Sequence, residues 1–184
     1  MSMTILKAPD EHYHRNSQRP FPPYRFVLGE NPHPTEDPQG HSYGQPAEDP
    51  GILKPDKWYE NSTYLFGVDL YNYAFWWESH EIFESLWRKV PQADPTSHFL
   101  QGLIKISAAF LKWNLKQQKG LEILYSGGIG QLHKVLDHST VYMGLNLMNH
   151  IAKVSIHFRE VIVQPHKWPD PLIDYPFIVL EKVE

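Results

Sequence analysis

Apolar side chains recur at intervals of three and four residues over most of the chain after Asp56, which is the spacing typical of amphipathic helices. Helices are predicted over about 56–72, over 75–89, from an N-cap at Asp94 to a stop at Gly120, and over 145–161. No alternating pattern of the kind that predicts a sheet runs through these segments. The expected fold class is therefore all-α, a single compact bundle of about five helices.

Glycines interrupt the helical pattern before the last predicted helix. The run SGGIG at 126–130 follows a short helical piece over 121–125, and it is expected to form a joint between two helices. A phosphate-binding loop is excluded, because GGIG is not followed by the lysine and hydroxyl residue that hold phosphate and magnesium. Gly102, at the flank of the third helix's apolar face, would let a neighbouring helix approach closely.

Prolines divide the chain into three parts. Most of the sixteen prolines lie at or before Pro55, so residues 1–55 are predicted to form an extended Pro-rich arm without helix or central strand. The arm also carries apolar residues that a freely solvated linker would lack, which favours docking on the body: Phe21, Tyr24, Phe26, Val27 and Tyr43. Residues 56–163 are expected to form the helical domain, and the Pro-rich segment 164–184 an irregular tail that could pack as an extended strip.

The stretch WWESHEIFESLWR, residues 76–88, places polar side chains among aromatic ones on a predicted helix. At about 100° per residue, His80, Glu84 and Trp87 share one stripe beside the apolar face. Glu81 borders this stripe, and Glu78 is expected to face solvent. Partial burial of His80 and Glu84 would disfavour each charged group alone and favour a hydrogen-bonded or metal-bound pair.

A structural role for the same residues has about equal weight. Glu84 and Arg88 have the spacing of an ordinary ion pair within a helix. His80 could donate a hydrogen bond to Asp69 or to a backbone carbonyl instead of binding a ligand.

Known metal motifs fit the stretch only in part. HEIFE is half of a metallopeptidase zinc helix, which needs a second histidine where this chain has Glu84, and the predicted helices lack the Glu-x-x-His motifs of di-iron bundles. The possibility that His80 and Glu84 bind a divalent metal ion stays open, and the candidates for a further ligand are His33, His41 and His98. No motif for an organic cofactor occurs, and the small ligand, if there is one, is unknown.

Composition narrows the classes of partner. The formal net charge is −4 with no long basic run, which disfavours nucleic-acid binding. No run approaches the roughly 20 apolar residues that span a bilayer, so no membrane partner is expected. The absence of cysteine excludes thiolate sites and fits a reducing compartment, and a cytoplasmic location is predicted. Aromatic residues make up 14% of the chain, enough to supply both a core and a homo-oligomeric interface.

Two longer segments carry motifs of their own: YLFGVDLYNYAFWWESHEIFESLWR at 64–88 and HFLQGLIKISAAFLKW at 98–113. Together they resemble the bacterial and archaeal proteins known as domain of unknown function 309. The first carries the motif His-Glu-x-x-Glu-x-x-Trp, formed here by His80, Glu81, Glu84 and Trp87. The second carries Leu-Gln-Gly-Leu-Ile at 100–104, which includes Gln101 and Gly102. The resemblance implies a compact helical bundle and no established activity, substrate or cofactor.

Two functional hypotheses follow from these residues. The first and favoured one is a structural or interaction module whose polar cluster is centred on His80 and Glu84. The second is an enzyme or small-ligand binder, with metal assistance or with glutamate and histidine as general acid and base. Its candidate pocket is made of His80, Glu81, Glu84, Trp87 and Gln101. Whether the protein is an enzyme stays open on the sequence.

Overall fold

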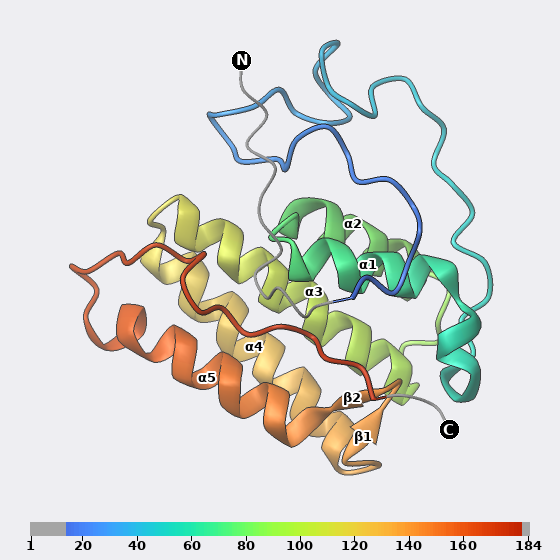
Figure 1. The fold of residues 1–184 in the computed structure, drawn as a ribbon. Coiled ribbons are helices and arrows are strands. Elements are labelled where there is room, and N and C mark those ends of the chain that lie inside the picture. The colour runs from blue at the N-terminus through green and yellow to red at the C-terminus, as the bar shows by residue number, and fades with distance from the viewer. Residues whose placement is uncertain (1–13, 182–184) are drawn as a thin grey trace.

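Helices make up most of the secondary structure of the computed structural model, which describes residues 14–181 (Figure 1). In chain order the elements are a 3₁₀ helix Pro55–Glu60, α1 Ser62–Asn72, α2 Trp76–Trp87, α3 Pro95–Asn114, α4 Gln118–Leu136, β1 Val141–Tyr142, β2 Leu145–Asn146 and α5 Leu147–Val163. The two strands form one short antiparallel hairpin. The predicted all-α bundle is confirmed.

Helix α3 lies in the middle of the bundle, with α1 and α2 on one side and α4 and α5 on the other (Figure 1). Aromatic rings fill the space between these helices. Phe110 of α3 stacks on Trp76 of α2 with ring centroids 4.3 Å apart, and it meets Phe158 of α5 edge-on at 4.8 Å. All three residues are buried, so one apolar core joins both sides of the bundle.

The predicted start of α3 is confirmed, but its predicted stop is wrong. Asp94 accepts a hydrogen bond from the Thr96 N–H at 2.7 Å, as an N-cap should. The helix ends at Asn114, because Lys116 adopts the left-handed conformation with φ 53° that usually falls to glycine. Gly120, the predicted stop, lies inside the first turn of α4.

The predicted break at SGGIG is also wrong, since α4 runs through it without interruption. The glycines serve packing instead. A Cβ on Gly128 would lie 2.9 Å from the Ile106 side chain and 3.1 Å from the Gly102 carbonyl, and a Cβ on Gly102 would lie 2.6 Å from Leu132. The close approach predicted at Gly102 is thus confirmed, and α3 and α4 approach closely because both lack side chains at their contact.

The C-terminal segment returns across the bundle and is held by the end of α1 (Figure 1). The buried Asn72 side chain donates to the Ile178 carbonyl at 2.7 Å and accepts from the Ile178 N–H at 2.8 Å. The Tyr175 hydroxyl donates to the Asn72 carbonyl at 2.7 Å. Asn72 therefore holds the C-terminal segment against the end of α1. The residue that adopts the left-handed conformation in the turn after α1 is Ala74, with φ 60°.

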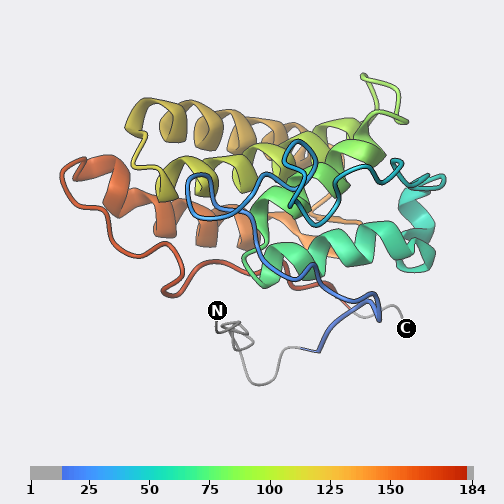
Figure 2. The ribbon, with the colours of Figure 1, turned by 90° about the horizontal axis from the view of Figure 1, so that it is seen from above.

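The described part of the arm lies over α1 and α2 (Figures 1 and 2). Phe21 stacks on Phe75 at 5.2 Å between ring centroids, and Phe26 and Val27 are buried, whereas Tyr43 is exposed. Within residues 14–181, no helix combines the length and apolar character needed to cross a lipid bilayer.

Candidate functional site

Helix α2 turns one side to the core and carries the polar cluster on the other. Trp76, Phe83 and Leu86 are buried, and the buried Ser79 hydroxyl donates to the Gly67 carbonyl at 2.9 Å, which fastens α2 to α1. Gly67 has no room for a side chain, because a Cβ there would lie 2.8 Å from the Phe83 ring. A rigid, well-packed helix therefore supports the polar residues on its outer side.

His80, Glu81 and Glu84 lie together on this outer side. One potential ligand atom from each residue lies within 4.8 Å of the other two. The His80 Nδ1 atom is 3.2 Å from the Glu81 carboxylate but lacks good hydrogen-bond alignment, and Glu84 accepts a bond from Arg88 at 3.0 Å. The side chains of His80 and Glu84 are 25% and 26% exposed. The cluster is therefore accessible from solvent without being fully hydrated.

The contact with His80 changes the acidity of Glu81. The polar contact with the imidazole is the largest influence and lowers the pKa of the Glu81 carboxyl, against the opposite effect of partial burial. Positive charge on Arg88 and His33 acts in the same direction as the imidazole. Glu81 is thus held in its anionic form, which is the form that binds cations.

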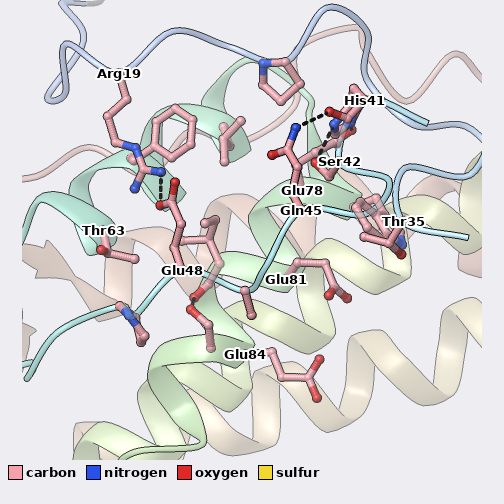
Figure 3. A pocket seen from close by; sticks show the side chains of 18 of the residues that line it. Arg19, Thr35, His41, Ser42, Gln45, Glu48, Thr63, Glu78, Glu81 and Glu84 are labelled. Carbon is pink, nitrogen blue, oxygen red and sulfur yellow. Dashed lines mark hydrogen bonds and ion pairs between the residues drawn. The ribbon is translucent and has the colours of Figure 1, made fainter. Parts of the chain in front are cut away.

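A cavity of about 640 Å³ opens between the arm and the outer sides of α1 and α2 (Figure 3). Arg19, His41 and Glu48 line it from the arm, Thr63 from α1, and Glu78, Glu81 and Glu84 from α2. Figure 3 shows the carboxylates of Glu81 and Glu84 directed to the same side of α2. The cluster therefore borders the cavity through two of its three members.

Glu78 contradicts the expectation that it faces solvent, since only 5% of the residue is exposed. Its Oε1 atom accepts a hydrogen bond from the Phe26 N–H at 2.8 Å and lies 3.4 Å from the His41 Nε2 atom. Its Oε2 atom accepts no hydrogen bond from the residues that the structure describes. The arm thus covers Glu78 and satisfies only one of its two oxygens.

The other candidate residues lie apart from the cluster. The Trp87 indole N–H donates to the Ser97 hydroxyl at 2.9 Å, which ties the end of α2 to α3. Gln101 is half-buried on α3 and does not line the cavity. His98 pairs with Gln131 at 2.8 Å.

The two candidate histidines of the arm, His33 and His41, have described contacts with residues other than His80. His33 packs edge-on against Trp77 with ring centroids 5.3 Å apart. His41 lies beside Glu78, with 3.4 Å between its Nε2 atom and the carboxylate, and is not among the three clustered residues.

Asp69 is a second buried carboxylate, and the sequence did not predict its contacts with the arm. It accepts hydrogen bonds from the Asn16 N–H at 2.9 Å and from the Ser17 N–H at 2.8 Å. The sequence had offered it as an acceptor for His80, but its described hydrogen bonds go to the arm. The only available signal was helical spacing, which places Asp69 beside the apolar face of α1.

The fold and the cluster together define an all-helical domain with a surface histidine and two glutamates on one helix. Residues 64–124 match the family model described as domain of unknown function (DUF309), which confirms the resemblance drawn from the two motifs. The match runs from α1 into α4 and includes the whole cluster, whereas the arm lies outside it. A comparison with curated proteins found no match.

Proposed function

We propose that the protein is a binding module in which His80, Glu81 and Glu84 hold one divalent transition-metal ion at the rim of the cavity. The observation that carries the proposal is the distance of at most 4.8 Å between their potential ligand atoms. The three residues come from consecutive turns of one rigid helix, so the folded chain brings them together without ordering a loop.

The donor set suits a borderline metal ion. One imidazole nitrogen and two carboxylates are ligands of Zn²⁺, Mn²⁺ and Fe²⁺, whereas Ca²⁺ prefers an all-oxygen set. In a tetrahedral site with bonds of about 2.1 Å, two ligand atoms would be about 3.4 Å apart. A shift of about 1.4 Å in the side chains would close the site, and a further position would stay open for water or a ligand.

The ion pair between Glu84 and Arg88 is a weak competitor. Arg88 is 68% exposed and pairs within the same helix, where such pairs contribute about 0.3–0.5 kcal/mol. A metal ion bound with a micromolar dissociation constant contributes about 8 kcal/mol. Arg88 therefore shifts the metal affinity slightly and does not block the site.

The contacts of the motif residues separate a structural part from a binding part. Trp87 and Gly102 contact other helices, as a structural role requires. The described hydrogen bonds and ion pairs of His80, Glu81 and Glu84 stay within α2. No hydrogen bond or ion pair described for these three side chains reaches another helix or the arm, which favours a ligand over a structural task.

Isothermal titration of the chelator-treated protein with Zn²⁺ and Mn²⁺ tests the proposal, with native mass spectrometry to count bound ions and chains. We expect one ion per chain in the wild type and at least tenfold weaker binding in His80→Ala and Glu84→Gln. His133→Ala is the matched control, because His133 is an exposed histidine on α4 outside the cluster.

Both cluster variants should keep the wild-type melting temperature without metal, since no hydrogen bond or ion pair described for these side chains reaches another helix or the arm. Equal metal binding by the wild type and His80→Ala would show that the ion binds elsewhere. A wild type that retains no stoichiometric ion would refute the proposal and leave the structural hypothesis.

A further inference from the structure

We propose that the cavity between the arm and α2 binds a small organic cation, a primary ammonium group on an apolar body, and that the buried carboxylate of Glu78 is its anchor. This site shares the cavity rim with the metal cluster through Glu81 and Glu84, but its anchor Glu78 is not one of the three proposed metal ligands. It rests on the polar contacts of Glu78, on the charges around the cavity and on its apolar walls.

Glu78 has one oxygen in use and one that lacks a donor. Phe26 donates its backbone N–H to Oε1 at 2.8 Å, and the His41 ring lies 3.4 Å from the same oxygen. Oε2 is buried and accepts no hydrogen bond from the part of the chain that the structure describes. Buried carboxylate oxygens are normally paired, so this oxygen is a natural acceptor for a donor that enters the cavity.

The charges around the cavity select a cation. Four glutamates and two arginines line it. Both arginines are already paired, Arg19 with Glu48 and Arg88 with Glu84. The remaining negative charge lies on Glu78 and Glu81, each beside an imidazole: the His41 Nε2 atom lies 3.4 Å from Glu78 and the His80 Nδ1 atom 3.2 Å from Glu81. An anionic ligand would be repelled, whereas an ammonium group would be attracted.

The walls around Glu78 favour an organic cation over a metal ion. Phe21, Phe66, Trp77 and Ile82 line the same cavity and offer no metal ligands. A metal ion needs several ligands, whereas an ammonium group needs one strong acceptor and can also lie against aromatic rings. The volume of about 640 Å³ is in the usual range for small-molecule sites.

Isothermal titration with phenethylamine, in the presence of a chelator, tests the site. The uncharged isostere 2-phenylethanol is the ligand control, and Glu160→Gln, at an exposed glutamate of α5, is the protein control. We expect the amine to bind the wild type and Glu160→Gln equally, and the alcohol to bind at least tenfold more weakly. In Glu78→Gln the amide oxygen can still accept from Phe26, but an NH₂ group replaces Oε2, so amine binding should fall at least tenfold.

Three results would overturn the inference: no amine binding by the wild type, equal binding of amine and alcohol, or unchanged affinity in a folded Glu78→Gln variant. If circular dichroism shows that Glu78→Gln does not fold, Thr63→Trp decides the matter. It narrows the cavity from the α1 side without touching the carboxylate, so amine binding must be lost if the cavity is the site. Metal titration of the same variants should be unchanged, which separates a failure of this site from a failure of the metal site.

Discussion

Replacing Asp69 by asparagine tests whether a buried carboxylate holds the arm on the helices. Asp69 is fully buried, and its two oxygens accept from the Asn16 N–H at 2.9 Å, the Asn16 side-chain amide at 3.0 Å and the Ser17 N–H at 2.8 Å. Arg15 lies 3.6 Å away and adds positive charge. In the variant, the new NH₂ group faces the Ser17 N–H, so a donor meets a donor and the negative charge is lost.

The expected cost follows from these contacts. A hydrogen bond to a charged group contributes about 1.5–3 kcal/mol, and the loss of one such bond with weakening of the others gives about 3 kcal/mol. If the arm opens alone, this energy corresponds to roughly a hundredfold faster amide exchange at Asn16 and Ser17. If arm and bundle unfold together, the melting temperature of a chain of this size falls by about 6–12 °C instead.

Hydrogen exchange read by mass spectrometry, together with a thermal melt, distinguishes these two outcomes. Asp137→Asn is the matched control, because Asp137 is exposed at the end of α4, and it should change neither measurement. The reasoning would be refuted if Asp69→Asn showed the same amide exchange at Asn16 and Ser17 and the same melting temperature as the wild type. The arm would then be held by other contacts.

Three further changes give independent tests. Gly128→Ala should lower the free energy of unfolding by about 1–3 kcal/mol in urea titrations, because its Cβ would lie 2.9 Å from the Ile106 side chain, whereas Gly130→Ala, with open space around its Cβ, should raise it by up to about 1 kcal/mol. Burial lowers the pKa of His150 to about 4, so the unfolded chain binds a proton between pH 6.5 and 4 that the folded chain does not. Stability is therefore lost as the pH falls through this window, and His150→Gln should flatten the slope by up to about 1.4 kcal/mol per pH unit in urea titrations at several pH values. Arg88→Ala should strengthen Zn²⁺ binding only about twofold in calorimetry, because the competing ion pair is exposed.

The helices could be predicted because their signal is local. Apolar spacing located α2 and α5 to within about two residues at most ends, which is the usual uncertainty at helix termini. The N-cap Asp94 is likewise a local interaction with Thr96. Each of these features depends on residues a few positions apart, so the sequence pattern contains the information.

The glycines show where local reasoning fails. Gly128 reads as a helix breaker on intrinsic propensity, but its place in α4 is decided by Gly102 and Ile106 on another helix. Tertiary contacts therefore outweighed propensity at Gly128. The predicted stop of α3 was wrong for a different reason: Lys116 adopts the left-handed conformation without a glycine, and the Lys116 and Gln117 N–H groups donate to carbonyls of the last turn.

The candidate site divides in the same way. One helix carries His80, Glu81 and Glu84, so their spacing in the sequence was enough to predict that they lie close together. The expectation that Glu78 faces solvent was wrong. The arm residues that cover it, Phe26 and His41, are far from it in the sequence, and such a long-range contact leaves no periodic pattern in the sequence. Asp69 was overlooked as an anchor of the arm for the same reason.

The arm therefore gives a way to test the two proposed sites against each other in one variant. The proposed metal ligands all belong to α2 and lie within the family match at 64–124, and their described polar contacts do not involve the arm. The cavity needs the arm as one wall, and Phe26 of the arm orients the Glu78 carboxylate. Loosening the arm by Asp69→Asn should weaken phenethylamine binding and leave Zn²⁺ binding within twofold of the wild type in calorimetry. Loss of both together in a folded variant would mean that the arm also orders the metal cluster, which the contacts within α2 argue against.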